Sequence, residues 1–358
     1  MKALIAMSGG VDSSVAALLM KERGFDCTGV TMKLFRNEDI GENQQHTCCS
    51  LDDVEDARSV ARLLKIPYYV FNFSDCFREC VMEKFVWCYE NGVTPNPCID
   101  CNRYLKFEKL FHRAQILGCD YVVTGHYARI TYDTAARRFL LKKALDSSKD
   151  QSYVLYTMTQ EQLQHSMFPL GELTKQQVRI IAQQHGFVTA HKHDSQDICF
   201  VSGNQYADFI RQYTSRAYPP GNFIDTNGNI IGTHKGIIHY TIGQRRGLGI
   251  ATGKPLYVCA IDLEKNQIVL GEEGSLYTHS LIAKDINLIS VEAIKSPMRV
   301  KAKIRYRQPE QWATVTQLSA DSLQLRFDIP QRAVAKGQAV VMYDGDTVIG
   351  GGTIVETF

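Results

Sequence analysis

Residues 3–14 read Ala-Leu-Ile-Ala-Met-Ser-Gly-Gly-Val-Asp-Ser-Ser, and this stretch decides the fold of the N-terminal half of the chain. A short apolar run ends at Met7, two glycines follow Ser8, and apolar residues then recur at helical spacing from Val11 to Leu19. The pattern predicts a buried parallel strand, a tight turn and a helix in direct succession. Backbone N–H groups at such a helix start bind anions, and glycine lets a phosphate approach the backbone closely.

The same turn is a candidate binding site for the phosphates of a nucleotide. It is not a Walker A loop, because no Gly-Lys-Ser/Thr triplet follows the glycines. The hydroxyls of Ser8, Ser13 and Ser14 add hydrogen-bond donors, and the Asp12 carboxylate is a candidate ligand for Mg²⁺ beside the phosphates. The turn resembles the Ser-Gly-Gly-x-Asp-Ser loop of PP-loop ATP pyrophosphatases. The resemblance implies an enzyme that cleaves ATP between the α- and β-phosphates and adenylates an oxygen of its substrate.

Size and composition are those of an ordinary globular protein with two or three domains: 358 residues, 44% hydrophobic and 22% charged. The formal net charge is only +2, so any nucleic-acid site must be local. No apolar run approaches the ~18 residues that span a bilayer, and the N-terminus carries no signal-peptide pattern. The 11 cysteines argue against a disulfide framework and for a reducing environment. We expect a cytoplasmic protein that makes no contact with a membrane.

Strand and helix patterns alternate over the first 205 residues, which predicts an α/β fold with a doubly wound parallel sheet. We expect strands at residues 3–7, 27–33, 68–73 and 121–124, and helices at residues 11–23, 51–64, 76–89 and 107–117. Short strands with Gly and Pro turns follow, including a hairpin-turn signal at residues 225–229. We therefore expect a catalytic domain at residues 1–205, a small central domain at residues 206–282 and a C-terminal β-barrel, or a sandwich, at residues 283–358.

A second candidate site is the stretch Thr-Pro-Asn-Pro-Cys-Ile-Asp-Cys-Asn at residues 94–102, which contains a Cys98-x-x-Cys101 pair. Its prolines predict a rigid, extended loop. Thiols at this spacing bind a metal ion, form a redox disulfide or present a nucleophile, and the pair alone leaves all three open. His46, Cys48 and Cys49 would supply further ligands if the pair binds zinc.

A third thiol, Cys199, follows a polar stretch that contains His191, Lys192 and His193. Cationic neighbours lower the pKa of a thiol and raise its reactivity if they lie close in space. A buried core cysteine before Phe200 is the alternative interpretation.

Two further polar segments complete the N-terminal pattern. His126 follows the predicted strand at residues 121–124, at the sheet edge where ligands bind, and a structural histidine is the alternative. Residues 149–153 read Lys-Asp-Gln-Ser-Tyr, a string that by itself is typical of any surface loop.

The clearest local signal for nucleic acid is a run of five cations at alternate positions in residues 299–307. In one β-strand all five side chains would point to the same face, where they repel each other unless a polyanion or carboxylates face them. This favours contact with nucleic-acid phosphates, and a solvated barrel face is the alternative. The basic loop at residues 244–249 would reach the same ligand.

Taken together, these stretches resemble the tRNA-specific 2-thiouridylase family nearly end to end. The matching strings are residues 8–14, 94–97 with 101–102, 124–127, 149–153, 194–195 with 198–200, 240–249 and 305–308. The resemblance implies a three-part layout, ATP and Mg²⁺ as cofactors, and tRNA with a wobble uridine as substrate, with lysine, glutamate and glutamine acceptors. It also implies a sulfur donor, either a persulfide-carrying relay protein or a cysteine desulfurase.

The resemblance assigns roles residue by residue. ATP would be held by Ala6, Met7, Ser8, Gly9, Gly10, Val11, Asp12, Ser13, Ser14, Met32 and Gly125. The tRNA would be contacted by Asn96, Pro97, Cys98, His126, Lys149, Asp150, Gln151, Arg305, Tyr306 and Gln338. Cys199 would carry a persulfide, and Cys101 would assist by closing a disulfide with Cys199 or releasing sulfide from it.

One departure from the family pattern affects the chemistry. Many members carry Asp where this chain has Cys98, so an acid–base role at that position is in question. Three thiols, those of Cys98, Cys101 and Cys199, would instead suit a [4Fe–4S] cluster with one open iron position. The persulfide route and the cluster route compete, and the sequence favours the persulfide route.

Two other functions fit parts of the pattern. A PP-loop ligase acting on a small molecule explains the Ser8–Ser14 turn but leaves the thiols and the cations without a role. A zinc-stabilised RNA-binding protein explains the thiols and cations, and it predicts no release of pyrophosphate.

Overall fold

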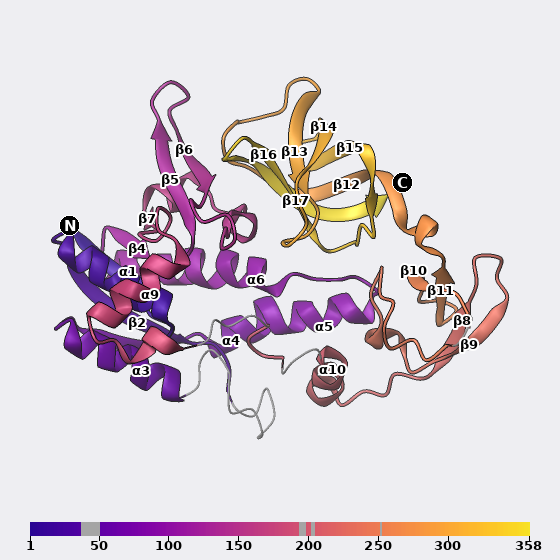
Figure 1. Ribbon diagram of the computed structural model, residues 1–358, viewed down its shortest axis with the longest axis horizontal. Helices are drawn as coiled ribbons and strands as arrows, with labels where there is room; N and C mark the ends of the chain where they lie inside the picture. The colour runs from indigo at the N-terminus through magenta and orange to yellow at the C-terminus, as the bar shows by residue number, and fades with distance from the viewer. Residues whose placement is uncertain (37–50, 193–197, 202–204, 251–252) are drawn as a thin grey trace.

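The structure is a computed structural model, and it describes residues 1–36, 51–192, 198–201, 205–250 and 253–358. Figure 1 shows three parts: an α/β domain that holds the N-terminus, a barrel of yellow strands that holds the C-terminus, and a smaller β-sheet region beside the barrel. Among the described residues, no helix is long and apolar enough to cross a membrane.

The N-terminal part is built on a parallel sheet with strand order β3-β2-β1-β4-β7. The central strand has alternating, fully buried side chains: Leu4 packs on one face of the sheet, and Ala3 and Ile5 pack on the other. Burial on both faces explains the unbroken apolar run in the sequence. The strands are β1 (Lys2–Ala6), β2 (Asp26–Lys33), β3 (Tyr68–Asn72), β4 (Tyr121–Val123) and β7 (Ser166–Met167).

Helices cover both faces of this sheet, which confirms the doubly wound α/β prediction. One face packs against α1, α3 and α9, and the other packs against the helices between β3 and β4. The helices are α1 (Val11–Glu22), α3 (Leu51–Leu63), α4 (Ser74–Phe77), α5 (Glu83–Glu90), α6 (Pro97–Asp100), α7 (Leu110–Ile116), α8 (Gln160–Gln164) and α9 (Lys175–Gln184). Short 3₁₀ turns lie at η3 (Ser152–Leu155) and η4 (Val188–His191).

Two predicted helices differ in detail from the structure. The helix predicted at residues 76–89 contains a π-helical turn, η1 (Arg78–Met82), between α4 and α5. The helix predicted at residues 107–117 is longer, because α6 and the π-helical η2 (Cys101–Lys109) lead directly into α7. The 3.6-residue periodicity sought in the sequence does not describe the wider turns of a π-helix.

A hairpin that the sequence pattern did not indicate follows β4. It consists of β5 (Ala128–Asp133) and β6 (Arg138–Lys143), and β6 pairs with the C-terminal strand through Lys142 and Thr347. The hairpin therefore extends the sheet of the barrel, beside which it stands in Figure 1, and it ties the α/β domain to the C-terminal domain.

The central part contains α10 (Tyr206–Thr214), the 3₁₀ turn η5 (Ile237–His239) and a four-stranded sheet of order β10-β11-β8-β9. Asp225 accepts hydrogen bonds from the backbone N–H groups of Asn227 and Asn229 at 2.8 and 2.9 Å, which confirms the predicted hairpin turn. The strands are β8 (Gly221–Ile224), β9 (Ile230–His234), β10 (Tyr257–Asp262) and β11 (Gln267–Gly271).

The C-terminal domain is a closed six-stranded barrel. Its strands follow the order β12-β15-β14-β13-β16-β17, and β12 also pairs with β17, which closes the ring and excludes an open sandwich. The strands are β12 (Tyr277–Leu288), β13 (Met298–Lys303), β14 (Gln311–Ser319), β15 (Ser322–Arg332), β16 (Ala339–Asp344) and β17 (Thr347–Thr357), and the turn η6 (Glu273–Leu276) precedes them.

The prediction of one cationic strand over residues 299–307 is wrong. Strand β13 ends at Lys303, so Arg305 and Arg307 lie in the turn that follows it. Arg299 forms an ion pair with Asp328 at 2.7 Å, and the Lys301 ammonium lies 5.3 Å from the centre of the Trp312 ring. A carboxylate and an aromatic face therefore relieve the repulsion within the row.

Candidate functional site

The glycine turn joins the carboxyl end of β1 to the first turn of α1. The Ser8 N–H donates to Ser13 Oγ at 3.1 Å, and the hydroxyls of Ser13 and Ser14 donate to the Gly10 carbonyl at 3.0 and 2.9 Å. Gly9 has a φ of +74°, and a Cβ there would lie 2.2 Å from the carbonyl oxygen of Asp53. The turn is therefore a rigid concave backbone that requires glycine at position 9, as a phosphate cradle does.

Gly125 lies directly against this turn. A Cβ at Gly125 would lie 2.8 Å from the Asp12 carbonyl carbon and 2.9 Å from the Ser13 nitrogen, both of which are backbone atoms. The structure thus brings the end of β4 onto the start of α1, as expected from the topology. Met32, near the end of β2, is half-buried and packs against the same cluster as Ala6.

Asp12 is held from two sides. The ammonium of Lys175 lies 2.7 and 2.8 Å from its two carboxylate oxygens, and the Tyr127 hydroxyl donates to Oδ1 at 2.8 Å. Sequence reasoning missed both partners. The only local signal near Lys175 is the capping box of Thr174 and Gln177, which marks the start of α9 but not the ion pair.

Magnesium does not fit the described residues as a site made by the protein alone. No group of three or more His, Cys, Asp and Glu side chains that could hold a metal ion occurs in the described ranges. Both oxygens of the candidate ligand Asp12 already contact Lys175.

His126 is buried between aromatic rings. Its Nδ1 lies 2.6 Å from Thr124 Oγ1, and the ring packs against Phe107 and Phe168. Burial, together with the nearby Lys106 ammonium, lowers the pKa of His126 well below its ordinary value. The imidazole is therefore neutral at pH 7.

The 94–102 loop is clamped between the α/β domain and the barrel. Gln338 Nε2 donates to the carbonyls of Thr94 and Pro95 at 3.0 and 2.9 Å, and the Thr94 N–H donates to the Lys336 carbonyl at 2.9 Å. Asn96 is the N-cap residue of α6 and Pro97 its first residue. The clamp presents the exposed Cys98 at the start of α6.

Cys101 and Cys199 belong to the same hydrophobic cluster although they are far apart in the sequence. Cys101 opens η2 and is buried, and Cys199 is half-buried and packs against the same cluster. The next residue, Phe200, is fully buried and makes edge contacts with Phe77 and Phe85. The buried Phe200 anchors Cys199 beside α4 and α5, in the cluster to which Cys101 also belongs.

The expectation that Lys192 activates Cys199 is not supported. The Lys192 ammonium contacts Asp53 at 2.5 Å, Asp56 at 2.7 Å and the Gly9 carbonyl at 3.2 Å, so it is bound to α3 and the glycine turn. His193, residues 194–195 and the candidate zinc ligands His46, Cys48 and Cys49 lie outside the described residues.

An iron–sulfur cluster does not fit the three thiols. Cys98 is exposed and Cys101 is buried, and within the described ranges no set of three or more His, Cys, Asp or Glu side chains could hold a metal ion.

The segment at residues 149–151 is tied into the fold by its own side chains. The Asp150 carboxylate accepts from the Ala144 N–H at 3.0 Å and the Ser152 hydroxyl at 2.8 Å. The Tyr306 hydroxyl of the barrel donates to the Asp150 carbonyl at 3.0 Å. Burial, then the charge of Asp150, raises the pKa of Tyr306. The structure thus joins residues 150 and 306, two of the predicted tRNA contacts.

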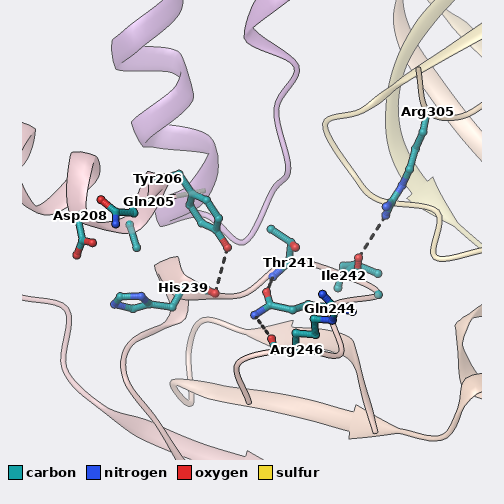
Figure 2. A pocket seen from close by; sticks show the side chains of 11 residues that line it. Gln205, Tyr206, Asp208, His239, Thr241, Ile242, Gln244, Arg246 and Arg305 are labelled. Atoms are coloured by element: carbon teal, nitrogen blue, oxygen red, sulfur yellow. Dashed lines mark hydrogen bonds between the residues drawn. The ribbon is translucent and has the colours of Figure 1, made fainter. Parts of the chain in front are cut away.

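Arg305 reaches from the barrel to the central domain. Its guanidinium donates to the carbonyls of Ile242 and Ala333 at 3.2 and 2.7 Å, and burial lowers its pKa. It lines an open pocket of about 500 Å³ between α10, η5 and the loop at residues 241–246. Figure 2 shows Tyr206, which donates to the His239 carbonyl at 3.0 Å, and Gln244, which braces the loop through Thr241 and Arg246. Sequence reasoning did not predict this pocket.

Comparison with known proteins places the chain in a family. Family models described as the tRNA methyl transferase HUP domain, the tRNA methyl transferase PRC-barrel domain and the aminomethyltransferase beta-barrel domain match residues 1–203, 207–272 and 278–354. The tRNA-specific 2-thiouridylase MnmA of Acetivibrio thermocellus is 52% identical over 354 residues, which cover 99% of each chain. The chain belongs to the tRNA-specific 2-thiouridylase family. The enzyme of the same name from Clostridioides difficile is 51% identical over 99% of this chain and 98% of its own.

Membership of the 2-thiouridylase family confirms the resemblance seen in the sequence strings. Among solved structures, a 4-thiouridine synthetase–RNA complex with bound ATP aligns at a TM-score of 0.36 and 19% identity. That alignment covers 60% of this chain and 50% of the other, and the likeness is too low to carry an inference.

Proposed function

We propose that this 2-thiouridylase family member replaces the C2 oxygen of a wobble uridine in tRNA with sulfur, at the expense of ATP. The C2 oxygen attacks the α-phosphorus of ATP, an O–P bond forms and pyrophosphate leaves. The terminal sulfur of a Cys199 persulfide then attacks C2, and the former C2 oxygen departs with AMP. Attack of the Cys101 thiolate on Cys199 Sγ breaks the persulfide S–S bond, leaves sulfur on C2 and forms a Cys101–Cys199 disulfide.

The observation that carries this proposal is the shared location of Cys101 and Cys199. Both thiols pack against one hydrophobic cluster on the face of the sheet whose central strand leads into the glycine turn. A persulfide on one thiol and attack by the other require the two sulfur atoms to meet, and packing against one cluster supports such a meeting. An external dithiol, or two monothiols, must reduce the disulfide to two thiols and become a disulfide in turn. A relay protein or cysteine desulfurase must then transfer persulfide sulfur to Cys199.

The nucleotide step is supported by the glycine turn. Its rigid backbone and the start of α1 suit the phosphates of ATP, and Gly125 leaves the turn uncovered by a side chain. Ala6, Met7, Val11 and Met32 surround this turn in the sequence or the packing, and their proposed role is to hold ATP.

The tRNA step is supported by charge at the domain junction. Among the described residues, Arg305 forms no ion pair with a carboxylate, and its buried Nε has no hydrogen-bond partner. A cation in this state favours an anionic ligand, and Arg246 lines the same pocket (Figure 2). We propose that phosphates of the tRNA bind here while the wobble base enters the α/β domain at Asn96, Pro97 and Cys98.

The deciding experiment is thiolation of unmodified tRNA bearing a wobble uridine. The protein is incubated with ATP, Mg²⁺, the tRNA and a cysteine desulfurase with cysteine as the source of persulfide sulfur, and the digested tRNA is searched for 2-thiouridine by mass spectrometry. The wild-type protein should form 2-thiouridine, and Cys199→Ser should form none while still releasing pyrophosphate in response to tRNA. Cys259→Ser is the matched control, because this half-buried thiol lies in β10, away from the cluster.

Two results would contradict the proposal. Formation of 2-thiouridine by Cys199→Ser would exclude the persulfide route. If the wild-type protein formed neither 2-thiouridine nor pyrophosphate, a PP-loop ligase acting on a small molecule would become the favoured function. Counting iron after anaerobic purification addresses the remaining alternative. About four irons per chain would favour the cluster route over the persulfide route.

A further inference from the structure

Two series of contacts, one through Tyr127 and one through Lys175, end at the Asp12 carboxylate. Tyr127 reaches its Oδ1 from the end of β4, and Lys175 reaches both oxygens from the first residue of α9. The Lys175 side chain is only 11% exposed and that of Asp12 is 33% exposed. The Lys175 ammonium also lies 5.8 Å from the centre of the Tyr127 ring, so the three side chains form one compact group.

Both chains lead back to the segment at residues 146–151. Tyr127 and Gln151 exchange two hydrogen bonds: the Tyr127 N–H donates to Gln151 Oε1 at 2.9 Å, and the Gln151 N–H donates to the Tyr127 carbonyl at 2.8 Å. At the other end, Asp146 Oδ2 accepts from the backbone N–H of Lys175 at 2.9 Å. Each end of the segment is therefore connected to Asp12 through a single intermediate residue.

The segment is connected on its far side to the barrel. The Tyr306 hydroxyl donates to the Asp150 carbonyl, and the Tyr306 ring packs against Tyr153, which is fully buried. Contacts are thus continuous from Tyr306 of the barrel, through residues 146–151, to the carboxylate at the glycine turn.

We propose that Tyr127 and Lys175 are positioning residues that couple occupancy of the 146–151 segment by tRNA to nucleotide binding at the glycine turn. Binding of tRNA to the segment stabilises the conformation seen here, in which Tyr127 and Lys175 hold the Asp12 carboxylate at the glycine turn. The inference rests on the proposed function only in that tRNA and ATP are the two ligands. Both residues act through Asp12 in this proposal.

The test measures the coupling directly. Dissociation constants of an ATP analogue that resists cleavage between the α- and β-phosphates are determined by calorimetry, with and without saturating unmodified tRNA. In the wild-type protein tRNA should tighten analogue binding by about 10-fold, and the analogue should tighten tRNA binding by the same factor. Tyr127→Phe removes one hydroxyl and keeps the ring, so this factor should fall close to one while the affinity for the analogue alone stays near the wild-type value.

Matched variants separate coupling from a merely structural effect. Tyr132→Phe alters an exposed tyrosine of the adjoining hairpin and should keep the full factor. In Lys175→Met, tRNA should no longer tighten binding of the analogue. In Lys175→Arg the tightening should be retained, because arginine can still pair with both Asp12 oxygens. Either of two results would overturn the proposal. In the first, tRNA tightens analogue binding by Tyr127→Phe as much as by the wild type. In the second, Tyr127→Phe binds the analogue more weakly by the same factor with and without tRNA.

Failure of this inference is distinguishable from failure of the proposed function. If the wild-type protein makes 2-thiouridine but tRNA and the analogue bind independently, the coupling is wrong and the function stands. If coupling is present and depends on the Tyr127 hydroxyl while no 2-thiouridine forms, the coupling stands and the function is wrong.

Discussion

Gln338 Nε2 in the barrel lies 2.9 Å from the carbonyl oxygen of Pro95 in the α/β domain, although the two residues are 243 positions apart. Together with the hydrogen bond from Gln338 to the Thr94 carbonyl, this contact ties the barrel to the loop at residues 94–102, because it holds the residues before Cys98. The C-terminal domain therefore helps to shape the candidate catalytic site.

Gln338→Glu should disturb this clamp with almost no change in side-chain size. A carboxylate cannot donate to two carbonyls, so we expect a loss of about 1–3 kcal/mol in the free energy of unfolding and a fall in thiolation rate. Denaturant titration and the 2-thiouridine assay measure the two effects. Gln324→Glu, at an exposed position on β15 of the same barrel, is the control and should change neither. Equal behaviour of the two variants would show that the clamp is unimportant.

Gly125→Ala should impair the nucleotide step. The new Cβ would lie within 3 Å of backbone atoms of Asp12 and Ser13, so the glycine turn must shift. A misplacement of about 1 Å at a reacting centre can lower the rate about 100-fold, and we expect the rate of pyrophosphate release to fall by about that factor. Gly274→Ala adds the same methyl group where no atom lies within 4 Å and should retain full activity. Normal ATP use by Gly125→Ala would remove position 125 from the nucleotide site.

Asp150→Ala should destabilise the folded protein, which the loss of a contact with tRNA alone would not do. Its carboxylate accepts from the N–H groups of Ala144 and Ser152 and from the Ser152 hydroxyl, and removal leaves these donors unpaired. We expect a loss of about 1–3 kcal/mol in unfolding free energy, measured by denaturant titration. Asp150→Asn keeps one acceptor oxygen and should lose less. If both variants are as stable as the wild type, the Asp150 carboxylate is not a structural anchor.

Stability should fall in mild acid because of His126. Its pKa in the folded protein lies well below 6.5, whereas the unfolded chain takes up a proton near pH 6.5. Below that pH the unfolded state binds more protons, so stability is lost as the pH falls, by up to about 1.4 kcal/mol per pH unit for this group. Burial also lowers the pKa values of His234 and His239, which act in the same direction.

His126→Gln should reduce this pH dependence whatever its effect on stability at neutral pH. Unfolding free energies at pH 7.5 and pH 5.5 give the slope for each protein. A variant with the wild-type slope would show that His126 titrates in the folded state as it does in the unfolded chain.

The local elements of the site follow from short stretches of sequence. The run at residues 3–14 specified the strand, turn and helix that hold the candidate nucleotide cradle, because apolar periodicity and glycine act within a few residues. The alternation of elements likewise specified the doubly wound sheet, and the strings around Cys101 and Cys199 specified the family.

Which side chains meet depends on the packing of elements that are far apart in the sequence. No local pattern indicated that Lys175 would pair with Asp12, that Lys192 would face α3 instead of Cys199, or that the hairpin at residues 128–143 would join the barrel sheet. Such contacts depend on how distant elements pack and register against one another, and that information is spread over the whole core. The periodicity of any one segment does not contain it.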